Sequence, residues 1–370
     1  MGSMASTPNI IPPRHPFVKA IVDGLAHHCH VLPGQKLLLA VSGGADSVAM
    51  LCAMSNIATR RRWRLKLVVG HVQHHLRDDA ESDAQLTEQL ANQHQLPFER
   101  IDLSIDTQAG NVEDMARQQR YAALIQMAKQ HDCTAVLTAQ HGLDQLETLL
   151  MRLLRGASLR GLGAMPWTRE LAHGIALMRP ALMTDHAMAI DLLNQINQTW
   201  CEDHTNTDTT RLRAALRQSV IPSLLELRPD LPQQIVNTTD QLQSLQHFLD
   251  IQCQQAVDHC LLVSKSSKHC QTYSRAKLKA LHPAMLSLVL RQVLAQAGVR
   301  PDRLGAKQLA QFGKMLSDQD GSVRQLALGR RVRGSLDRHH LTLTPTSGAN
   351  KPPATDLSEH KDEGQGIEDC

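Results

Sequence analysis

The sequence has few aromatic residues, no paired cysteines and no long apolar run. Phe, Trp and Tyr make up only 2% of the 370 residues, so stacking on aromatic rings can be only a minor way of binding nucleobases. None of the eight cysteines belongs to a C-x-x-C pair, which argues against a disulfide framework or a four-thiolate metal site and favours a reducing, cytoplasmic setting. No stretch approaches the roughly 20 apolar residues of a membrane helix, so no membrane association is expected.

Neither sign of charge dominates, because the chain has 39 Lys and Arg residues and 36 Asp and Glu residues, and its net charge is only +3. A polyanionic partner must therefore be held by local basic clusters. The densest are RRRWRLK (60–66), which can simply end a helix on a solvated face, and RRVRGSLDRHH (330–340). Residues 1–16 lack the apolar core of a secretory signal, and we interpret them as a tag remnant and a flexible N-terminus.

Short apolar runs alternate with helical stretches through the first half of the chain. The runs are KLLLAV (36–41), LKLVVGHV (65–72), FERIDL (98–103) and CTAVLTA (133–139). Strands and helices at this spacing predict an α/β fold with a doubly wound parallel sheet, covered by helices on both faces. Ligands of such sheets bind at the carboxyl ends of the strands.

The strand signal disappears after residue 222. Long helical patterns (231–262, 283–298 and 304–317) predict an all-helical domain over 223–320. Short alternating runs broken by glycine predict a small C-terminal β-element over 321–345. Residues 346–370 are almost without apolar side chains, so we expect a disordered tail.

The first strand runs directly into a glycine-rich loop, SGGADS (42–47), and a helix follows. Backbone N–H groups at a helix start favour an anion, and two glycines allow it to approach the backbone closely. The loop has no lysine, so it is not a Walker P-loop, and no G-x-G-x-x-G string occurs. The alternative is that the loop is only a tight connection.

The string S-G-G-x-D-S resembles the PP-loop of the N-type ATP pyrophosphatases. The resemblance implies that ATP is the cofactor and that the loop holds its β,γ-diphosphate, which leaves as pyrophosphate. The residues concerned are Ser42, Gly43, Gly44, Ala45, Asp46 and Ser47. Asp46 would also help to position Mg²⁺, which would neutralise phosphate charge in place of the missing lysine.

Further strings narrow this resemblance, and in chain order they are HVQHHLR (71–77), ARQQRY (116–121), AQHGLDQLETLLMRLLRGASLRGLGAM (139–165), RPAL (179–182), WCEDHTN (200–206) and RLRAALRQSVIP (211–222). Together with the loop they resemble the tRNA(Ile)-lysidine synthetases, strongly over about 36–225 and more weakly to 344. That implies a catalytic domain over 17–222 with an adenine nucleotide α-hydrolase-like fold, and a helical tRNA-binding domain over 223–320.

The resemblance also implies a reaction and its partners. Such a ligase adenylates the C2 oxygen of the wobble cytidine of tRNA(Ile) with a CAU anticodon. It then attaches L-lysine to give lysidine and releases AMP and pyrophosphate. It would be cytoplasmic, and a homodimer is possible.

Site residues follow from the resemblance, position by position. Asp144 would hold the lysine amine and later accept its proton. Arg117, Arg213 and Arg217 would stabilise charge on the adenylate phosphate, while Arg120 would bind ATP. His71, at the end of the second strand, would lie where the family binds adenine.

Each assignment has a structural alternative. Asp144 could only cap its helix, and Arg117 and Arg120 could form a solvated helix face. Glu147 could bind Mg²⁺ or form a salt bridge near Arg155, and His141 could be a hydrogen-bonded core residue. The pair His74 and His75 fits surface positions better than a metal site, because no third ligand stands at a suitable spacing.

The sequence departs from the family pattern where the amine and base would bind. Leu143 replaces an acidic or amide residue, Ala214 replaces the asparagine of an R-N-x-x-R string, and DHTN (203–206) replaces D-P-S-N. Two rival functions therefore stay open. One is a PP-loop tRNA-modifying enzyme with another amine or sulfur as nucleophile, although a thiolase would be expected to carry paired cysteines. The other is a non-catalytic PP-loop protein that binds RNA.

Overall fold

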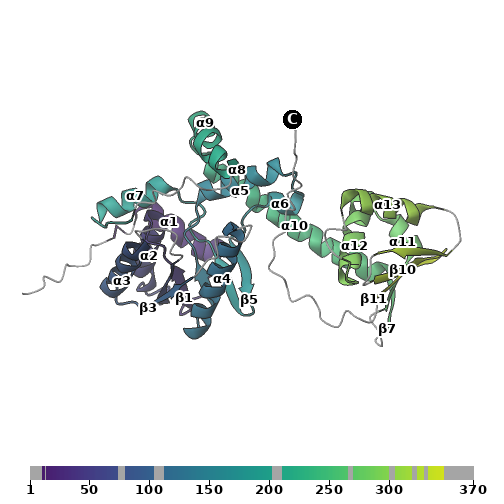
Figure 1. The fold of residues 1–370 in the computed structure, drawn as a ribbon, viewed down its shortest axis with the longest axis horizontal. Coiled ribbons are helices and arrows are strands. Elements are labelled where there is room, and N and C mark those ends of the chain that lie inside the picture. Colours follow the sequence, from purple (N-terminus) through teal and green to yellow (C-terminus); the bar gives the residue numbers. More distant parts are fainter. Residues whose placement is uncertain are drawn as a thin grey trace, which may run out of the picture. The chain divides into compact units, whose positions relative to one another are not determined.

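The computed structural model describes residues 11–12, 14–73, 80–103, 112–201, 211–265, 270–299, 305–318, 323–328 and 332–345. The chain divides into two compact units, residues 1–244 and 245–370, which are coloured from purple to yellow along the sequence in Figure 1. The predicted disordered tail, 346–370, and the first ten residues lie outside the described part of the chain.

The described part of the chain includes residues before the predicted domain boundary at residue 17. His15 is buried, and its ring accepts a hydrogen bond from the backbone N–H of Phe17 at the start of α1 (Pro16–Asp23). Its other ring nitrogen lies 3.0 Å from Oδ2 of Asp191. Because this partner is distant in sequence, local composition gave no sign that residue 15 is fixed.

A six-stranded sheet forms the centre of the first unit, in the order β3-β2-β1-β4-β6-β5. All neighbouring pairs are parallel except β5 and β6, which form an antiparallel hairpin at one edge. The strands are β1 (Lys36–Ala40), β2 (Lys66–Gln73), β3 (Phe98–Asp102), β4 (Ala135–Leu137), β5 (Thr168–Ala172) and β6 (Ile175–Met178). The predicted parallel α/β sheet is therefore confirmed.

Helices cover both faces of this sheet, because successive side chains of each strand point to opposite sides. Leu37 and Leu39 of β1 join a core formed with α1, α2 (Ala45–Ala58) and α7 (His186–Gln195). Leu38 packs on the other side against α4 (Val112–Gln130). Helix α3 (Ala80–Gln93) connects β2 to β3. Figure 1 shows these helices around the strands.

The strand order reverses at β1, which lies between β2 and β4. The connections that leave β1 and β4 therefore diverge at the carboxyl edge and leave a crevice there, the usual ligand site of such sheets. The glycine-rich loop follows β1 directly, and α5 (Gly142–Leu154) follows β4.

Helix α5 packs against the short helix that follows it and against three short helical elements that the chain reaches about 60 residues later. Leu146 of α5 forms a small core with Leu216 and Ile221. The elements beside it are α6 (Leu159–Leu162), α8 (Arg211–Ala215), the π-helical turn η2 (Leu216–Val220) and α9 (Ile221–Leu227). Along α5, Leu146 and Leu149 are buried, whereas Leu153 and Leu154 are exposed at the end of the helix.

The second unit is built on an antiparallel sheet in the order β7-β8-β11-β10-β9. Its apolar face packs against the end of α10, which spans Leu231–Cys260, and against three further helices. The helices are α11 (Arg275–Ala280), α12 (Pro283–Gln296) and α13 (Ala306–Ser317), and the strands are β7 (Leu261–Lys265), β8 (Cys270–Ser274), β9 (Arg324–Ala327), β10 (Val332–Leu336) and β11 (His340–Pro345).

This sheet is larger than the predicted β-element. Strands β7 and β8 come from the segment that we expected to be wholly helical, so the helical region and the sheet share one core. The reason is long-range pairing: Tyr273 of β8 pairs with Leu341 of β11. Among the described residues, no helix combines the length and the apolar character required to cross a bilayer.

Candidate active site

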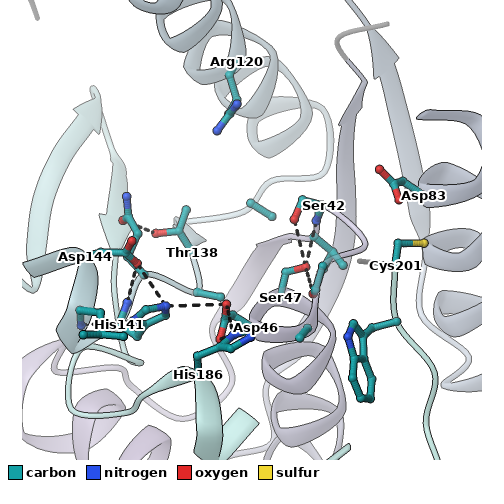
Figure 2. A pocket seen from close by; sticks show the side chains of 18 of the residues that line it. Ser42, Asp46, Ser47, Asp83, Arg120, Thr138, His141, Asp144, His186 and Cys201 are labelled. Atoms are coloured by element: carbon teal, nitrogen blue, oxygen red, sulfur yellow. Dashed lines mark hydrogen bonds and ion pairs between the residues drawn. The ribbon is translucent and has the colours of Figure 1, made fainter. Parts of the chain in front are cut away.

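A cleft of about 1160 Å³ opens at the carboxyl edge of the first unit's sheet. Its lining includes the glycine-rich loop, the ends of β2 and β4, and side chains of α4, α5, α7 and η2. Figure 2 shows that Asp46, Ser47, Asp144 and His186 face this space. Residues that the sequence associates with one reaction are therefore gathered in one place.

Hydroxyl groups close the glycine-rich loop on itself. Oγ of Ser47 accepts from the backbone N–H of Ser42 at 3.1 Å and donates to the carbonyl of Gly44 at 2.9 Å. The two serine hydroxyls lie 3.2 Å apart, as Figure 2 shows. The loop is thus held in a fixed shape before any ligand enters, which favours anion binding at the start of α2.

Gly43 is required by both conformation and space. Its φ of +93° lies in the region that side chains disfavour. An added Cβ would also meet the Cβ of Asp83 at 3.1 Å. The carbonyl of Gly43 accepts from the backbone N–H of Cys201 at 3.0 Å, so the loop is tied to the segment that follows α7.

Two histidines connect the loop carboxylate to α5 and α7. Nδ1 of His186 lies 3.1 Å from both carboxylate oxygens of Asp46. Nε2 of His141 lies 3.7 Å from Oδ2 of Asp46 and 3.7 Å from Oδ2 of Asp144. The hydrogen bond to Asp46 is the main reason why the pKa of His186 is raised. His141 is consequently part of the cleft and not an isolated core residue.

Asp144 caps helix α5 and also lines the cleft. Its Oδ2 accepts from the backbone N–H of His141 at 3.0 Å, while Nδ1 of His141 accepts from Leu143, which together make a capping box at the start of α5. The carboxylate nevertheless lines the cleft and stays about one-third exposed. Capping thus fixes its position without removing it from a ligand.

Glu147 is bound by two arginines. Its side chain is only 3% exposed and accepts from Nε of both Arg213 and Arg217. Nη2 of Arg217 also lies 3.7 Å from Oδ1 of Asp144. Of the two alternatives for Glu147, Mg²⁺ binding or a salt bridge near Arg155, the structure shows a salt bridge, but its partners are Arg213 and Arg217. A buried carboxylate requires such partners, because an unpaired charge there is very costly.

Helix α4 contributes cations to the opposite wall. Arg117 and Arg120 both line the cleft, and Figure 2 shows Arg120 extending toward it. Arg117 is half-buried and Arg120 is exposed, so their positions agree both with lining the cleft and with a solvated helix face.

His71 is buried at the floor of the cleft. One ring nitrogen bonds to the carbonyl of Val41 at 2.9 Å and the other contacts Gln73 at 3.2 Å. Both ring nitrogens are thus engaged within the protein. His74 and His75 lie outside the described residues.

The sequence did not single out Asp83, Tyr121 or His186 as site residues. Asp83 approaches the loop from α3, and all three line the cleft. Tyr121 is the last residue of the ARQQRY string, so the family resemblance could have identified it as a site residue. His186 and Asp83 belong to no recognisable motif. Only the folded arrangement brings them to the loop.

The donor set fits Mg²⁺ when phosphate supplies further ligands. Asp46 and Asp144 offer two partly exposed carboxylates on either side of one imidazole. Within the described ranges, no group of three or more His, Cys, Asp or Glu side chains is placed to hold a metal by itself. Mg²⁺ commonly takes one or two carboxylates, together with phosphate oxygens and water.

Comparisons with known proteins find relatives for both units of the chain. Residues 18–224 match the family described as the PP-loop domain, and residues 274–337 match the TilS substrate binding domain. A tRNA(Ile)-lysidine synthase of Nostoc sp. is 30% identical over 285 residues, which cover 76% of this chain and 80% of the relative. Those of Synechococcus sp. and Geobacter sulfurreducens are 34% and 32% identical over 56% and 65% of this chain.

These last two alignments cover only 62% and 51% of the relatives' own lengths, so the chain spans little more than half of either relative. Among solved structures, a tRNA thiolase, NcsA from Methanococcus maripaludis, is similar with a TM-score of 0.54 at 13% identity. The match covers 61% of this chain and 77% of that one. At this identity the likeness shows the fold alone.

Proposed function

The chain belongs to the tRNA(Ile)-lysidine synthase family, and we propose that it joins lysine to the wobble cytidine of tRNA(Ile) at the expense of ATP. The C2 oxygen of the cytosine attacks the α-phosphate of ATP, and pyrophosphate leaves. The ε-amine of lysine then attacks C2, the C–O bond breaks, and AMP leaves. The observation that carries the proposal is that the loop, two carboxylates and cleft-lining arginines share one cleft.

ATP binding is supported by the geometry of the loop. The hydroxyl groups of Ser42 and Ser47 face each other at the start of the helix. Gly43 has no side chain, so phosphate oxygens could approach the backbone closely there. The absence of lysine from the loop leaves room for a divalent cation beside Asp46. When bound, Mg²⁺ would neutralise charge on the phosphates, and Asp46 would hold it.

Asp144 is suited to receive the lysine amine. Its carboxylate is anchored by the capping box and still one-third exposed, so an ammonium group can reach it. In the second step it would accept the proton that the attacking amine loses. Glu147 is less suited, because Arg213 and Arg217 already neutralise it.

Arg117 and Arg120 would act at the adenylate from the opposite wall, where guanidinium groups can stabilise charge that develops on the phosphate. Arg213 and Arg217 would act indirectly, by shaping the acidic side of the cleft through Glu147. His71 would support the floor against which adenine packs, since its ring nitrogens are engaged inside the protein.

The second unit would grip the tRNA. It contains the match to the TilS substrate binding domain, and the basic cluster over 330–340 falls largely within it. With so few aromatic residues, contacts to phosphate would dominate and binding would weaken steeply as salt rises. We place the reaction in the cytoplasm, where the unpaired cysteines would stay reduced. A homodimer remains a prediction.

The test is transfer of labelled lysine to a tRNA(Ile) transcript with a CAU anticodon, measured beside pyrophosphate release. A transcript with uridine at the wobble position is the matched control. Incorporation only into the CAU transcript would support the proposal. Pyrophosphate release without incorporation of lysine would favour another nucleophile. If neither pyrophosphate nor labelled tRNA is formed, the result would favour a non-catalytic RNA-binding protein.

A further inference from the structure

Gln140 and Arg179 meet at the edge of the sheet where the cleft opens. Each lies shortly beyond the carboxyl end of a strand, β4 and β6, and these strands are parallel neighbours in which Leu137 pairs with Met178. The side chains that follow the paired ends are therefore brought together. Nε of Arg179 donates to Oε1 of Gln140 at 2.6 Å, and Oγ1 of Thr138 donates to the same oxygen at 3.0 Å (Figure 2).

Arg179 is a well-anchored donor. It is only 2% exposed, Nη1 donates to the carbonyl of Pro166 at 2.7 Å, and its backbone N–H donates to the carbonyl of Trp167 at 2.9 Å. Burial lowers the pKa of Arg179 to about 10, so the guanidinium group keeps its proton at neutral pH. A charged guanidinium group only donates hydrogen bonds, so the atom of Gln140 that it contacts must be the carbonyl oxygen of the amide.

The orientation of the Gln140 amide is therefore determined by its partners. Its oxygen accepts from two donors, and its NH2 group occupies the other position with two hydrogens to donate. Gln140 is half-buried and lines the cleft. Within the described ranges, no protein group accepts a hydrogen bond from this NH2 group. The amide is thus a donor that is held in place and available to a ligand.

The surroundings of Gln140 narrow the choice of ligand group. Asp144, to which we assign the amine, accepts from the backbone N–H of His141, the residue after Gln140. The glycine-rich loop, to which we assign the phosphates, follows β1, the strand beside β4. In the proposed reaction the cytosine must lie between the two, because its C2 oxygen attacks the α-phosphate and its C2 atom receives the amine. A neutral donor at the end of β4 is therefore suited to the base.

We propose that the NH2 group of Gln140 donates a hydrogen bond to N3 of the wobble cytosine and so selects cytidine against uridine. N3 of cytosine is an acceptor, whereas N3 of uracil carries a hydrogen and would face a second donor. Unstacked RNA bases are commonly read through this edge. Donation to N3 also draws electron density from the neighbouring C2, the atom that the amine attacks. The identity of the base rests on the proposed function.

The experiment measures the Kd of anticodon stem-loop RNAs that differ only at the wobble position. The full chain is titrated in the presence of an ATP analogue that cannot be cleaved between the α- and β-phosphates. We expect the wild type to prefer cytidine to uridine by about 10-fold or more, the scale of one hydrogen bond. An RNA with 3-deazacytidine, which has a C–H group in place of N3, should bind the wild type about 10-fold more weakly than cytidine.

Two substitutions test the contact from the protein side. Gln140→Glu keeps an oxygen for Arg179 and Thr138 but places a second acceptor where the NH2 group was, so the preference for cytidine should disappear or reverse. Gln140→Met removes the donor, and cytidine and 3-deazacytidine should then bind equally. Gln93→Glu is the matched control, because it adds the same charge at an exposed position of α3 outside the cleft lining.

Three results would overturn the proposal. One is a wild type that binds the cytidine, 3-deazacytidine and uridine RNAs equally, and this test needs no variant to fold. Another is a Glu variant that binds every RNA more weakly by the same factor, because Gln140 would then act only on the fold. The third is a change confined to the KM for lysine, which would assign the NH2 group to the carboxylate of the amino acid.

Failure of the proposed function would look different. A wild-type chain that prefers cytidine through Gln140 but transfers no lysine would refute the ligase activity and support the base contact. A chain that forms lysidine while its Gln140 variants keep the wild-type ratio of the two Kd values would support the ligase activity and overturn the base contact.

Discussion

Nδ1 of His186 lies 3.1 Å from both carboxylate oxygens of Asp46, which is 140 residues earlier in the chain. The acidic residue of the glycine-rich loop is therefore held by α7, the helix that packs against α2 from the same side of the sheet. The carboxylate that we assign to Mg²⁺ thus also contributes to the stability of the fold.

The His186–Asp46 pair should stabilise the metal-free protein in a pH-dependent way. The pKa of His186 is raised by its hydrogen bond to Asp46, so the folded state binds its proton more tightly than the unfolded chain. Its contribution is present below the unfolded pKa of about 6.5 and is lost as pH rises through the higher folded value. Calorimetric Tm values of wild type and His186→Gln should differ most near pH 5.5 and converge toward pH 8.5.

A difference in Tm that stays constant with pH would contradict this assignment. His247→Gln, an exposed residue of α10, is the matched control and should leave Tm unchanged at both pH values.

Asp46→Ala should abolish pyrophosphate release while leaving the fold intact. The carboxylate is 30% exposed and contributes little packing, whereas the loop would lose the group that we assign to Mg²⁺. Initial rates and far-UV circular dichroism provide the measurement. Asp230→Asn, which removes an exposed surface carboxylate paired with Arg228, is the control. A folded Ala variant with normal turnover would show that Asp46 has no part in catalysis.

Asp144→Asn separates capping from catalysis. Asn retains an oxygen that can accept from the backbone N–H of His141 and caps helices about as well as Asp, so Tm should change little. Lysine transfer should fall by about 10²-fold or more, the usual scale for a general acid or base. The affinity for ATP should remain close to that of the wild type. Transfer at a near-normal rate with saturating lysine would reduce Asp144 to a structural role.

Glu147→Gln should destabilise the first unit. The substitution removes the charge that Arg213 and Arg217 share and replaces one acceptor oxygen by a donating NH2 group. One of the two arginines therefore loses its acceptor, at a cost of about 1–3 kcal/mol. Arg213→Leu should cost less, because Arg217 still pairs with the carboxylate. Urea unfolding would measure both, with Glu226→Gln on the exposed side of α9 as the control. Equal stability of Glu147→Gln and wild type would mean that the two arginines find other partners.

Some predictions from the sequence succeeded because their signals are local. The run from residue 36 to 58 predicts strand, loop and helix in that order, and β1, the loop and α2 follow it. The alternation of strands and helices likewise predicted the parallel sheet and the edge at which its cleft lies. The helical pattern before residue 261 gave no warning of β7 and β8, because a five-residue strand is identified by its partner and not by its own composition.

Local sequence is enough to identify the glycine-rich loop, its place at a strand–helix junction and the acidic residue at the start of α5. These depend on neighbouring residues, on backbone freedom at Gly43 and on helix capping at Asp144, all of which act over a few positions. Which side chains meet depends on the tertiary fold. Glu147 pairs with Arg213 and Arg217, 66 and 70 residues later, and the ring of Tyr121 meets the guanidinium group of Arg169. These contacts depend on how the helices and strands pack together. Packing decides which residues from distant parts of the sequence lie next to each other.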